Sequence, residues 1–273
     1  MRKRLFLCSE EDIASVNIRN ALTASVKWED DGKFLYFGDT VMMSIPDIHI
    51  RAESIDGKAK EAGIDAKEMI FLSRHSAASK IPTLTVHPIG NFHDAELGGR
   101  PRTLVKAPPA AMTEILRNMM SSDTGNFKVS FEVTHHGPYV DIPAAFVEIG
   151  SDASQWNNKD AAKAIAGALL KMNDNGYVNA IGIGGGHYAP RFTEVVQKYK
   201  MNIGHMVPEY AFKDSDDEDL IRMIGEAARK SDTKIVYVHK RSMNAATAKR
   251  VFAAVGSCGL EPIGSDDLDI IGN

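Results

Sequence analysis

The sequence is poor in cysteine, in long apolar runs and in net positive charge. Its two cysteines, Cys8 and Cys258, lie far apart and in no metal-ligand spacing, which indicates a reducing, cytoplasmic setting without a disulfide framework. The apolar run 5–8 that follows the basic N-terminus is too short for a signal peptide, and no run approaches the length of a membrane span. We therefore expect no membrane partner.

The charge balance sets a further limit. The formal net charge is −4, so no global positive field attracts nucleic acid, and a DNA partner is not expected. Positive charge is instead local, in loops after expected strands and in the polar segment 94–106: Arg74 and Lys80; Arg100, Arg102 and Lys106; Arg191; Lys240 and Arg241. These side chains either form a rim that contacts phosphate or are ordinary solvated charges.

Apolar runs and turn residues predict an alternation of strands and helices. The 273 residues are 44% hydrophobic and 25% charged, which suffices for a sizeable globular core. Strands are expected at 5–8, 34–37, 41–45, 70–72, 83–87, 127–134, 144–149, 178–183 and 234–239. Helices are expected at 10–26 with Ser9 as N-cap, and at 108–120, 161–172, 214–230 and 244–255, the last ended by Gly256.

This alternation predicts an α/β fold with a mixed, largely parallel sheet flanked by helices. Residues 1–273 are expected to form a single catalytic unit. Because 34–45 has the pattern of a hairpin around Gly38-Asp39, part of the N-terminal half is expected to form a smaller lobe.

Three consecutive glycines follow the expected strand 178–183. Gly184-Gly185-Gly186 costs backbone entropy, and a fold gains little from it unless something must approach the backbone closely. The loop continues into His187, Tyr188 and Arg191, and loops after strands of α/β proteins are where ligands bind. No Gly-Lys-Ser/Thr follows, so this is not a P-loop. The glycine amides are predicted to bind a phosphate or a developing oxyanion, the alternative being a flexible turn.

Histidines follow several of the short apolar runs. They are His75, His87, His93, His135, His136, His187 and His239. Because strand ends of a parallel sheet gather at one edge, we expect these imidazoles to converge there and to serve a metal or acid–base site. The alternative for any one of them is a solvated or hydrogen-bonded loop histidine.

Two carboxylates accompany these histidines. Strand alternation would place Glu132, Thr134 and His136 on one face and His135 on the other. Glu148 lies inside an apolar strand, where it either needs a metal or a histidine as partner or faces water from an edge strand. Imidazole and carboxylate ligands suit zinc, although neither an HExxH nor a CxxC motif is present.

Five motifs, in order along nearly the whole chain, resemble the D-aminoacyl-tRNA deacylase family of archaea and plants. They are Leu72-Ser73-Arg74-His75, His87-Pro88-Ile89-Gly90-Asn91-Phe92, the segment from Glu132 to Pro138, the segment from Phe146 to Ser151, and the segment from Gly184 to Thr193. The resemblance implies zinc and a fold like that of phosphorylases and peptidyl-tRNA hydrolases. It also implies hydrolysis of the ester between a D-amino acid and the 3′ end of tRNA, a proofreading step in translation.

Residue chemistry within these motifs predicts the site. The expected metal ligands are His75, His136, Glu148 and His187, and the expected catalytic groups are His135 and His187 with the amides of Gly185 and Gly186. Arg74, Tyr188 and Arg191 are expected to bind substrate, the 3′ acceptor end of D-aminoacyl-tRNA, on a monomeric enzyme. The alternatives are an enzyme like peptidyl-tRNA hydrolase or nucleoside phosphorylase, and a tRNA-binding protein without catalysis.

Overall fold

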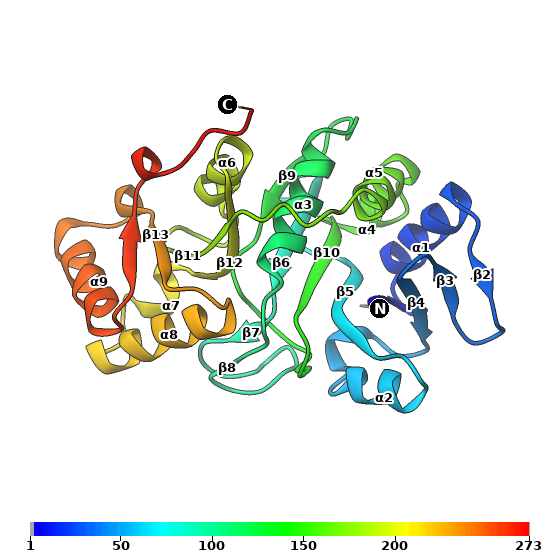
Figure 1. Ribbon diagram of the computed structural model, residues 1–273, viewed down its shortest axis with the longest axis horizontal. Coiled ribbons are helices and arrows are strands. Elements are labelled where there is room, and N and C mark those ends of the chain that lie inside the picture. The colour runs from blue at the N-terminus through cyan, green and yellow to red at the C-terminus, as the bar shows by residue number, and fades with distance from the viewer. Residues whose placement is uncertain (1–2, 273) are drawn as a thin grey trace.

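The computed structural model describes residues 3–272 and contains two larger β-sheets and one two-stranded sheet (Figure 1). The eight-stranded sheet has the order β2-β3-β4-β1-β5-β10-β6-β9, the four-stranded sheet has the order β12-β11-β13-β14, and β7 pairs with β8. The strands are β1 (Lys3–Ser9), β2 (Glu29–Asp30), β3 (Leu35–Phe37), β4 (Thr40–Ile45), β5 (Ala66–Arg74), β6 (Thr83–Pro88), β7 (Gly90–Asn91), β8 (Thr103–Leu104), β9 (Lys128–Phe131), β10 (Ala144–Gly150), β11 (Val178–Ile183), β12 (Met201–Val207), β13 (Ile235–Val238) and β14 (Glu261–Ile263).

The predicted mixed, largely parallel sheet is confirmed. In the larger sheet β4, β1, β5 and β10 are parallel neighbours, β6 runs antiparallel to β10, and β9 runs parallel to β6. The four-stranded sheet is parallel throughout. The expected hairpin is present as the antiparallel pair β3–β4.

Helices cover the sheets on both sides. They are α1 (Ile13–Ser25), α2 (Ile55–Glu61), α3 (Pro109–Met120), α4 (Ala153–Trp156), α5 (Lys159–Leu170), α6 (Pro190–Lys198), α7 (Glu209–Phe212), α8 (Asp217–Lys230) and α9 (Ala245–Ser257). Alternate residues of the larger sheet enter two different cores: Phe6 and Val147 pack with α1, α3 and α5, whereas Leu7 and Phe146 pack on the opposite face, with α2. Helices α8 and α9 lie beside the second sheet at the C-terminal end of the molecule (Figure 1). Within residues 3–272, no helix combines the length and apolarity needed to cross a bilayer.

Several predicted boundaries are wrong for local reasons. Asp12, not Ser9, caps α1, because its carboxylate accepts the N–H groups of Ala14 and Ser15. Helix α9 continues past Gly256, which lies in its last turn. The polar segment 94–106, for which no strand was predicted, contains strand β8, and its Leu104 is fully buried.

Two further differences affect the functional residues. The strand expected at 127–134 ends at Phe131 as β9, although the N–H of Glu132 still donates to the Val86 carbonyl of β6. Strand β12 was not predicted, because its buried residues include the polar Asn202 and His205.

Candidate active site

The site lies against one face of the larger sheet, on β10 and β6. In the antiparallel register Phe146 pairs with His87 and Glu148 pairs with Thr85, so these four side chains share a face, and all are buried. The segment 132–136 runs along this face after β9 ends. The loop after β11 joins it through a bridge between Glu132 and Tyr188.

One group of ligand-type side chains surrounds the Glu132 carboxylate, which is 0% exposed. Oε2 of Glu132 lies 3.0 Å from Nε2 of His187 and 3.4 Å from Nε2 of His135, and Oε1 lies 3.3 Å from Nδ1 of His75. His75, Glu132 and His187 each offer one ligand atom within 4.8 Å of the others. Three chain segments distant in sequence therefore meet at one carboxylate.

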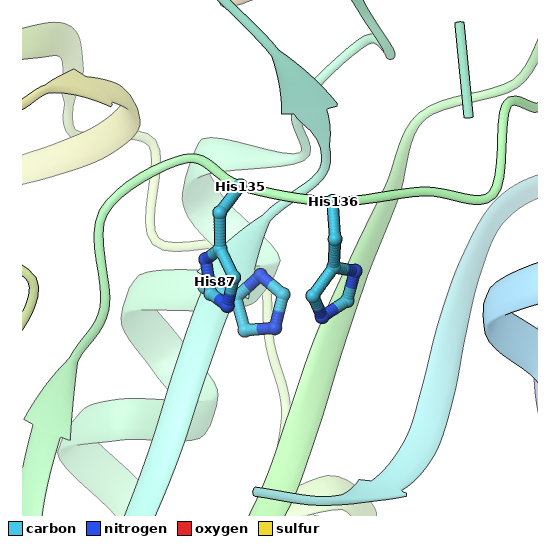
Figure 2. A group of neighbouring side chains, drawn as sticks. All are labelled: His87, His135 and His136. Carbon is cyan, nitrogen blue, oxygen red and sulfur yellow. The ribbon is translucent and has the colours of Figure 1, made fainter. Parts of the chain in front are cut away.

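A second group consists of three imidazoles. Figure 2 shows the rings of His87, from β6, and of His135 and His136, from the segment after β9, gathered together. Their ring centroids lie 4.1 Å (His87–His135), 4.5 Å (His135–His136) and 4.8 Å (His87–His136) apart. Glu148 lies between the two groups, 3.6 Å from Nδ1 of His75 and 3.8 Å from Nε2 of His87.

Backbone carbonyls fix the tautomer of all three rings in the second group. The Nδ1–H of His87 donates to the Pro88 carbonyl at 3.1 Å, that of His135 to Val133 at 2.7 Å, and that of His136 to Gly137 at 2.6 Å. A carbonyl oxygen only accepts, so Nδ1 carries the proton and Nε2 keeps its lone pair. Such an outer hydrogen bond orients a histidine as a metal ligand.

The two groups and Glu148 together are called the cluster here. Burial and the charges of neighbouring side chains determine the pKa values of its members. Burial, followed by the neighbouring imidazoles, holds the pKa of His135 well below its usual range, and burial with His87 nearby lowers the pKa of His136 to about 4. Burial would raise the pKa of Glu148, but hydrogen bonding and charge from His75 and His87 hold that pKa well below its ordinary value. Burial opposes protonation of His75 and His87, but hydrogen bonding and charge from Glu148, with the charge of Glu132, raise the pKa of both. A cation binds the neutral forms of imidazoles, which the lowered pKa values favour at His135 and His136.

The donor set fits a metal ion. Both carboxylate oxygens of Glu132 and Nε2 of His87 are buried and have no hydrogen-bond partner among residues 3–272. A buried carboxylate without a partner is costly, and a cation among these atoms would remove that cost. The described residues thus contain two groups of three that can hold a metal ion.

The predicted ligands come together, but not as one set. His75 and His187 belong to the first group, His136 belongs to the second, and Glu148 stands between them. The predicted ligand set omitted Glu132 and His87. The predicted strand alternation of residues 132–136 is wrong, because β9 has ended and His136 adopts a φ of 39°, which turns the chain so that Glu132 and both histidines face the same cluster.

Two of the strand-end histidines lie outside the cluster. Nε2–H of His93 donates to the Ala211 carbonyl at 2.7 Å, and the His239 ring packs near Phe192, 6.3 Å between centroids. The histidines were expected at the ends of strands. Two members of the cluster, His87 and Glu148, instead lie within β6 and β10, on one face of the sheet.

The glycine loop makes contacts that limit its predicted role. The Gly185 N–H donates to Oγ of Ser242 at 2.9 Å, so this amide has a partner within the protein and would have to leave it to bind an oxyanion. Gly186 is exposed, with nothing within 4 Å of an added Cβ. Gly184 has a φ of 103°, and a Cβ there would lie 2.7 Å from Oγ of Ser242, so close packing explains this glycine.

The predicted substrate-binding side chains are placed as follows. Arg191 pairs with Glu194 at 2.8 Å and also donates to the hydroxyls of Tyr237 and Ser265. The guanidinium of Arg74 lies over Trp156, 4.8 Å from the ring centroid. The Tyr188 hydroxyl lies 3.0 Å from Nε2 of His75, so Tyr188 contacts the cluster directly.

A cavity of about 310 Å³ opens onto the cluster. Its lining includes side chains of the cluster together with the apolar Ile48, Ile50 and Leu97 and the polar His49 and Arg74. A mainly apolar lining with a few polar side chains is the usual form of a small-molecule site.

An α/β fold with a histidine–carboxylate cluster that could hold a metal ion, beside a cavity, is an arrangement typical of hydrolytic enzymes. The family model for D-aminoacyl-tRNA deacylase matches residues 62–263. Relatives named D-aminoacyl-tRNA deacylase are 33% identical in Methanosarcina mazei (97% of this chain, 93% of the relative), 38% in Thermoplasma acidophilum (76% and 79%) and 35% in Archaeoglobus fulgidus (96% of each). The chain belongs to the D-aminoacyl-tRNA deacylase family, and the predicted family and enzyme class are confirmed.

A solved structure agrees with this fold over its full length. The crystal structure of a conserved protein of unknown function is 32% identical, superposes with a TM-score of 0.86 and is covered to 98%, as is this chain. The arrangement of the two sheets is thus shared with a relative.

Proposed function

We propose that this enzyme hydrolyses the ester that joins a D-amino acid to the 3′ end of tRNA, releasing the free amino acid and tRNA. It acts as a monomer in the cytoplasm. The family supports the activity, and one observation supports its location. The Glu132 carboxylate is fully buried, has no hydrogen-bond partner among the described residues, and lies beside a cavity of about 310 Å³, large enough for an aminoacyl group. An apolar wall at Ile48, Ile50 and Leu97 receives the amino-acid side chain.

Zinc is the proposed metal, because imidazole nitrogens and a carboxylate are its usual protein ligands. His75, Glu132 and His187 would hold one ion, and His87, His135 and His136 a second, with Glu148 between them. When bound, zinc supplies Lewis-acid polarisation of the ester and lowers the pKa of water. This assignment makes His135 a metal ligand. Its Nδ1–H donates to the Val133 carbonyl, which leaves the lone pair of Nε2, 3.4 Å from Oε2 of Glu132, free for an ion.

The chain's own side chains position the substrate. The Tyr188 hydroxyl, held by His75, is placed to hydrogen-bond the 3′ oxygen that leaves as the ester opens. The buried carboxylates and the apolar wall exclude bulk water and orient the acyl group, and an already labile ester needs little beyond positioning.

The test is deacylation of matched D-tyrosyl-tRNA and L-tyrosyl-tRNA, with and without chelator. We expect hydrolysis of the D form, its loss in chelator, and its return with added zinc. Full activity in chelator after removal of bound metal would contradict the zinc proposal. Faster hydrolysis of N-acetyl-L-aminoacyl-tRNA than of D-tyrosyl-tRNA would instead indicate a peptidyl-tRNA hydrolase.

Two histidine variants make a matched pair. His136→Ala removes a cluster imidazole and is expected to reduce deacylation by roughly 100-fold, the size usual for loss of a metal ligand or its support. His93→Ala removes a histidine outside the cluster and should leave the rate unchanged. Equal rates for the two variants would remove the cluster from the mechanism.

A further inference from the structure

A second groove begins beside the active site, on the other side of Tyr188. Its volume is about 390 Å³, and Ile81, Val129, Ser130, Tyr188, Pro190 and Gln197 line it; we call it the edge groove. Ile81 is 43% exposed there, one of the more exposed large apolar side chains. Its exposed surface is mainly apolar, although the charged Lys128 and Glu194 also line it.

The edge groove follows the free edge of the larger sheet. Strand β9 is the last strand of that sheet, and within residues 3–272 β6 is its only neighbour there. The even-numbered residues of this segment form hydrogen bonds toward β6: the N–H of Lys128 donates to Pro82, and that of Glu132 donates to Val86. The alternate residue Phe131 bonds outward, since its N–H donates to Oγ1 of Thr193 and its carbonyl accepts from Ala189.

The same alternation turns the main chain of Val129 outward. Backbone donors and acceptors of successive strand residues point to opposite sides in the ladder, so the N–H and C=O of Val129 lie on the side of Phe131. There Val129 lines the edge groove. An edge strand presents its unpaired N–H and C=O as a template for a partner with matching groups.

A purine base matches this surface. Adenine carries an acceptor ring nitrogen beside the N6 amino donor, which complements an adjacent N–H and C=O, and its flat face stacks on aromatic and apolar side chains. Every tRNA ends in an adenosine, whose ribose carries the aminoacyl ester.

The edge groove is continuous with the cluster through Tyr188. This residue lines the groove, pairs with Glu132 by a backbone bridge, and places its hydroxyl 3.0 Å from Nε2 of His75. Resting on the proposed function, we propose that the edge groove binds the adenine base of the terminal tRNA nucleotide. The ribose then lies at Tyr188 and the acyl group over the cluster, and the exposed Lys128 on the rim faces the phosphates.

The experiment compares two small D-tyrosyl esters, 2′(3′)-O-D-tyrosyladenosine and the same ester of 1-O-methylribose, which carries no base. The wild type is expected to hydrolyse the adenosine ester with a kcat/KM roughly tenfold higher, since one stacked base contributes an effect of this size. Ile81→Asp places a charge in the groove and should raise KM for the adenosine ester while kcat stays near that of the wild type. Val129→Pro removes the outward N–H and should have the same effect, because that N–H is outside the ladder.

Phe252→Asp is the matched control, because Phe252 is an apolar residue on α9 that is 39% exposed and outside the groove. It should behave as the wild type. Hydrolysis of both esters at equal kcat/KM, or an unchanged KM in both groove variants, would refute the role of the groove and leave the proposed function standing. No hydrolysis of D-tyrosyl-tRNA or of either ester would refute the proposed function, and the groove assignment with it.

Discussion

Acid is expected to destabilise this fold through His205, a fully buried histidine of β12. Its Nε2–H donates to the Val105 carbonyl at 2.8 Å, so Nδ1 accepts from the hydroxyl of Thr134 at 3.0 Å. Protonation of Nδ1 would reverse this bond, so that the Thr134 hydroxyl, next to His135, would have to accept and its own hydrogen would lose its acceptor. Burial lowers the pKa of His205 from 6.5 to about 4.

The direction of this pH effect on the free energy of unfolding follows from the difference in proton binding between the folded and unfolded chains. Because the folded-state pKa is the lower one, the unfolded chain takes up the proton first, and stability is lost as the pH falls from about 6.5 to about 4. At about 1.4 kcal/mol for each pH unit between these values, the loss approaches roughly 3 kcal/mol.

His205→Gln provides the comparison, because an amide can donate to Val105 and accept from Thr134 without titrating. The free energy of unfolding would be measured in urea with chelator, for both proteins, from about pH 7 to about pH 4.5. The wild type should lose roughly 2 kcal/mol more than the variant over this range. The other buried histidines titrate in both proteins and cancel. Parallel stability curves would show that His205 does not titrate in this way.

Three more predictions concern the site and its loops. Glu132→Gln keeps the shape of the side chain but removes its buried charge. Zinc at 1,000 times its Kd should stabilise the wild type by about 4 kcal/mol in thermal unfolding, compared with the protein in chelator, and this stabilisation should largely disappear in the variant. An unchanged zinc effect would exclude Glu132 as a ligand. Gly137→Ala should destabilise by about 3 kcal/mol in urea unfolding, because its Cβ would lie 2.0 Å from the backbone nitrogen of Gly99, whereas Gly167→Ala has open space and should not destabilise. Tyr188→Phe should lower kcat for D-tyrosyl-tRNA by roughly tenfold with little change in KM, since it removes the hydroxyl but keeps the aromatic wall, and an unchanged kcat would exclude that hydroxyl from the reaction.

Elements with a regular apolar pattern were predictable from the sequence. Strand β10 and helix α8 match their predicted ranges closely. The strand is apolar except for Glu148, and the helix has acidic residues in its first turn and basic residues in its last. Strand β12 was not predictable in this way, because His205 and Asn202 are buried through hydrogen bonds that only the folded chain supplies.

The site shows the same limit. The sequence indicated which histidines follow strands, and five of them do meet: His75, His87, His135, His136 and His187. It did not indicate how they divide into two groups. That depends on the left-handed turn at His136 and on the bridge between Glu132 and Tyr188, which bring residues from separate halves of the chain to one carboxylate.

This arrangement has a consequence for synthesis of the protein on the ribosome. The cluster draws on β5, on β6, on the segment after β9 and on the loop after β11, and Thr134 is held by β12, which ends at Val207. A growing chain that has not yet released β12 lacks the support for its own active residues. The cluster therefore assembles late in synthesis, after about three quarters of the chain has left the ribosome.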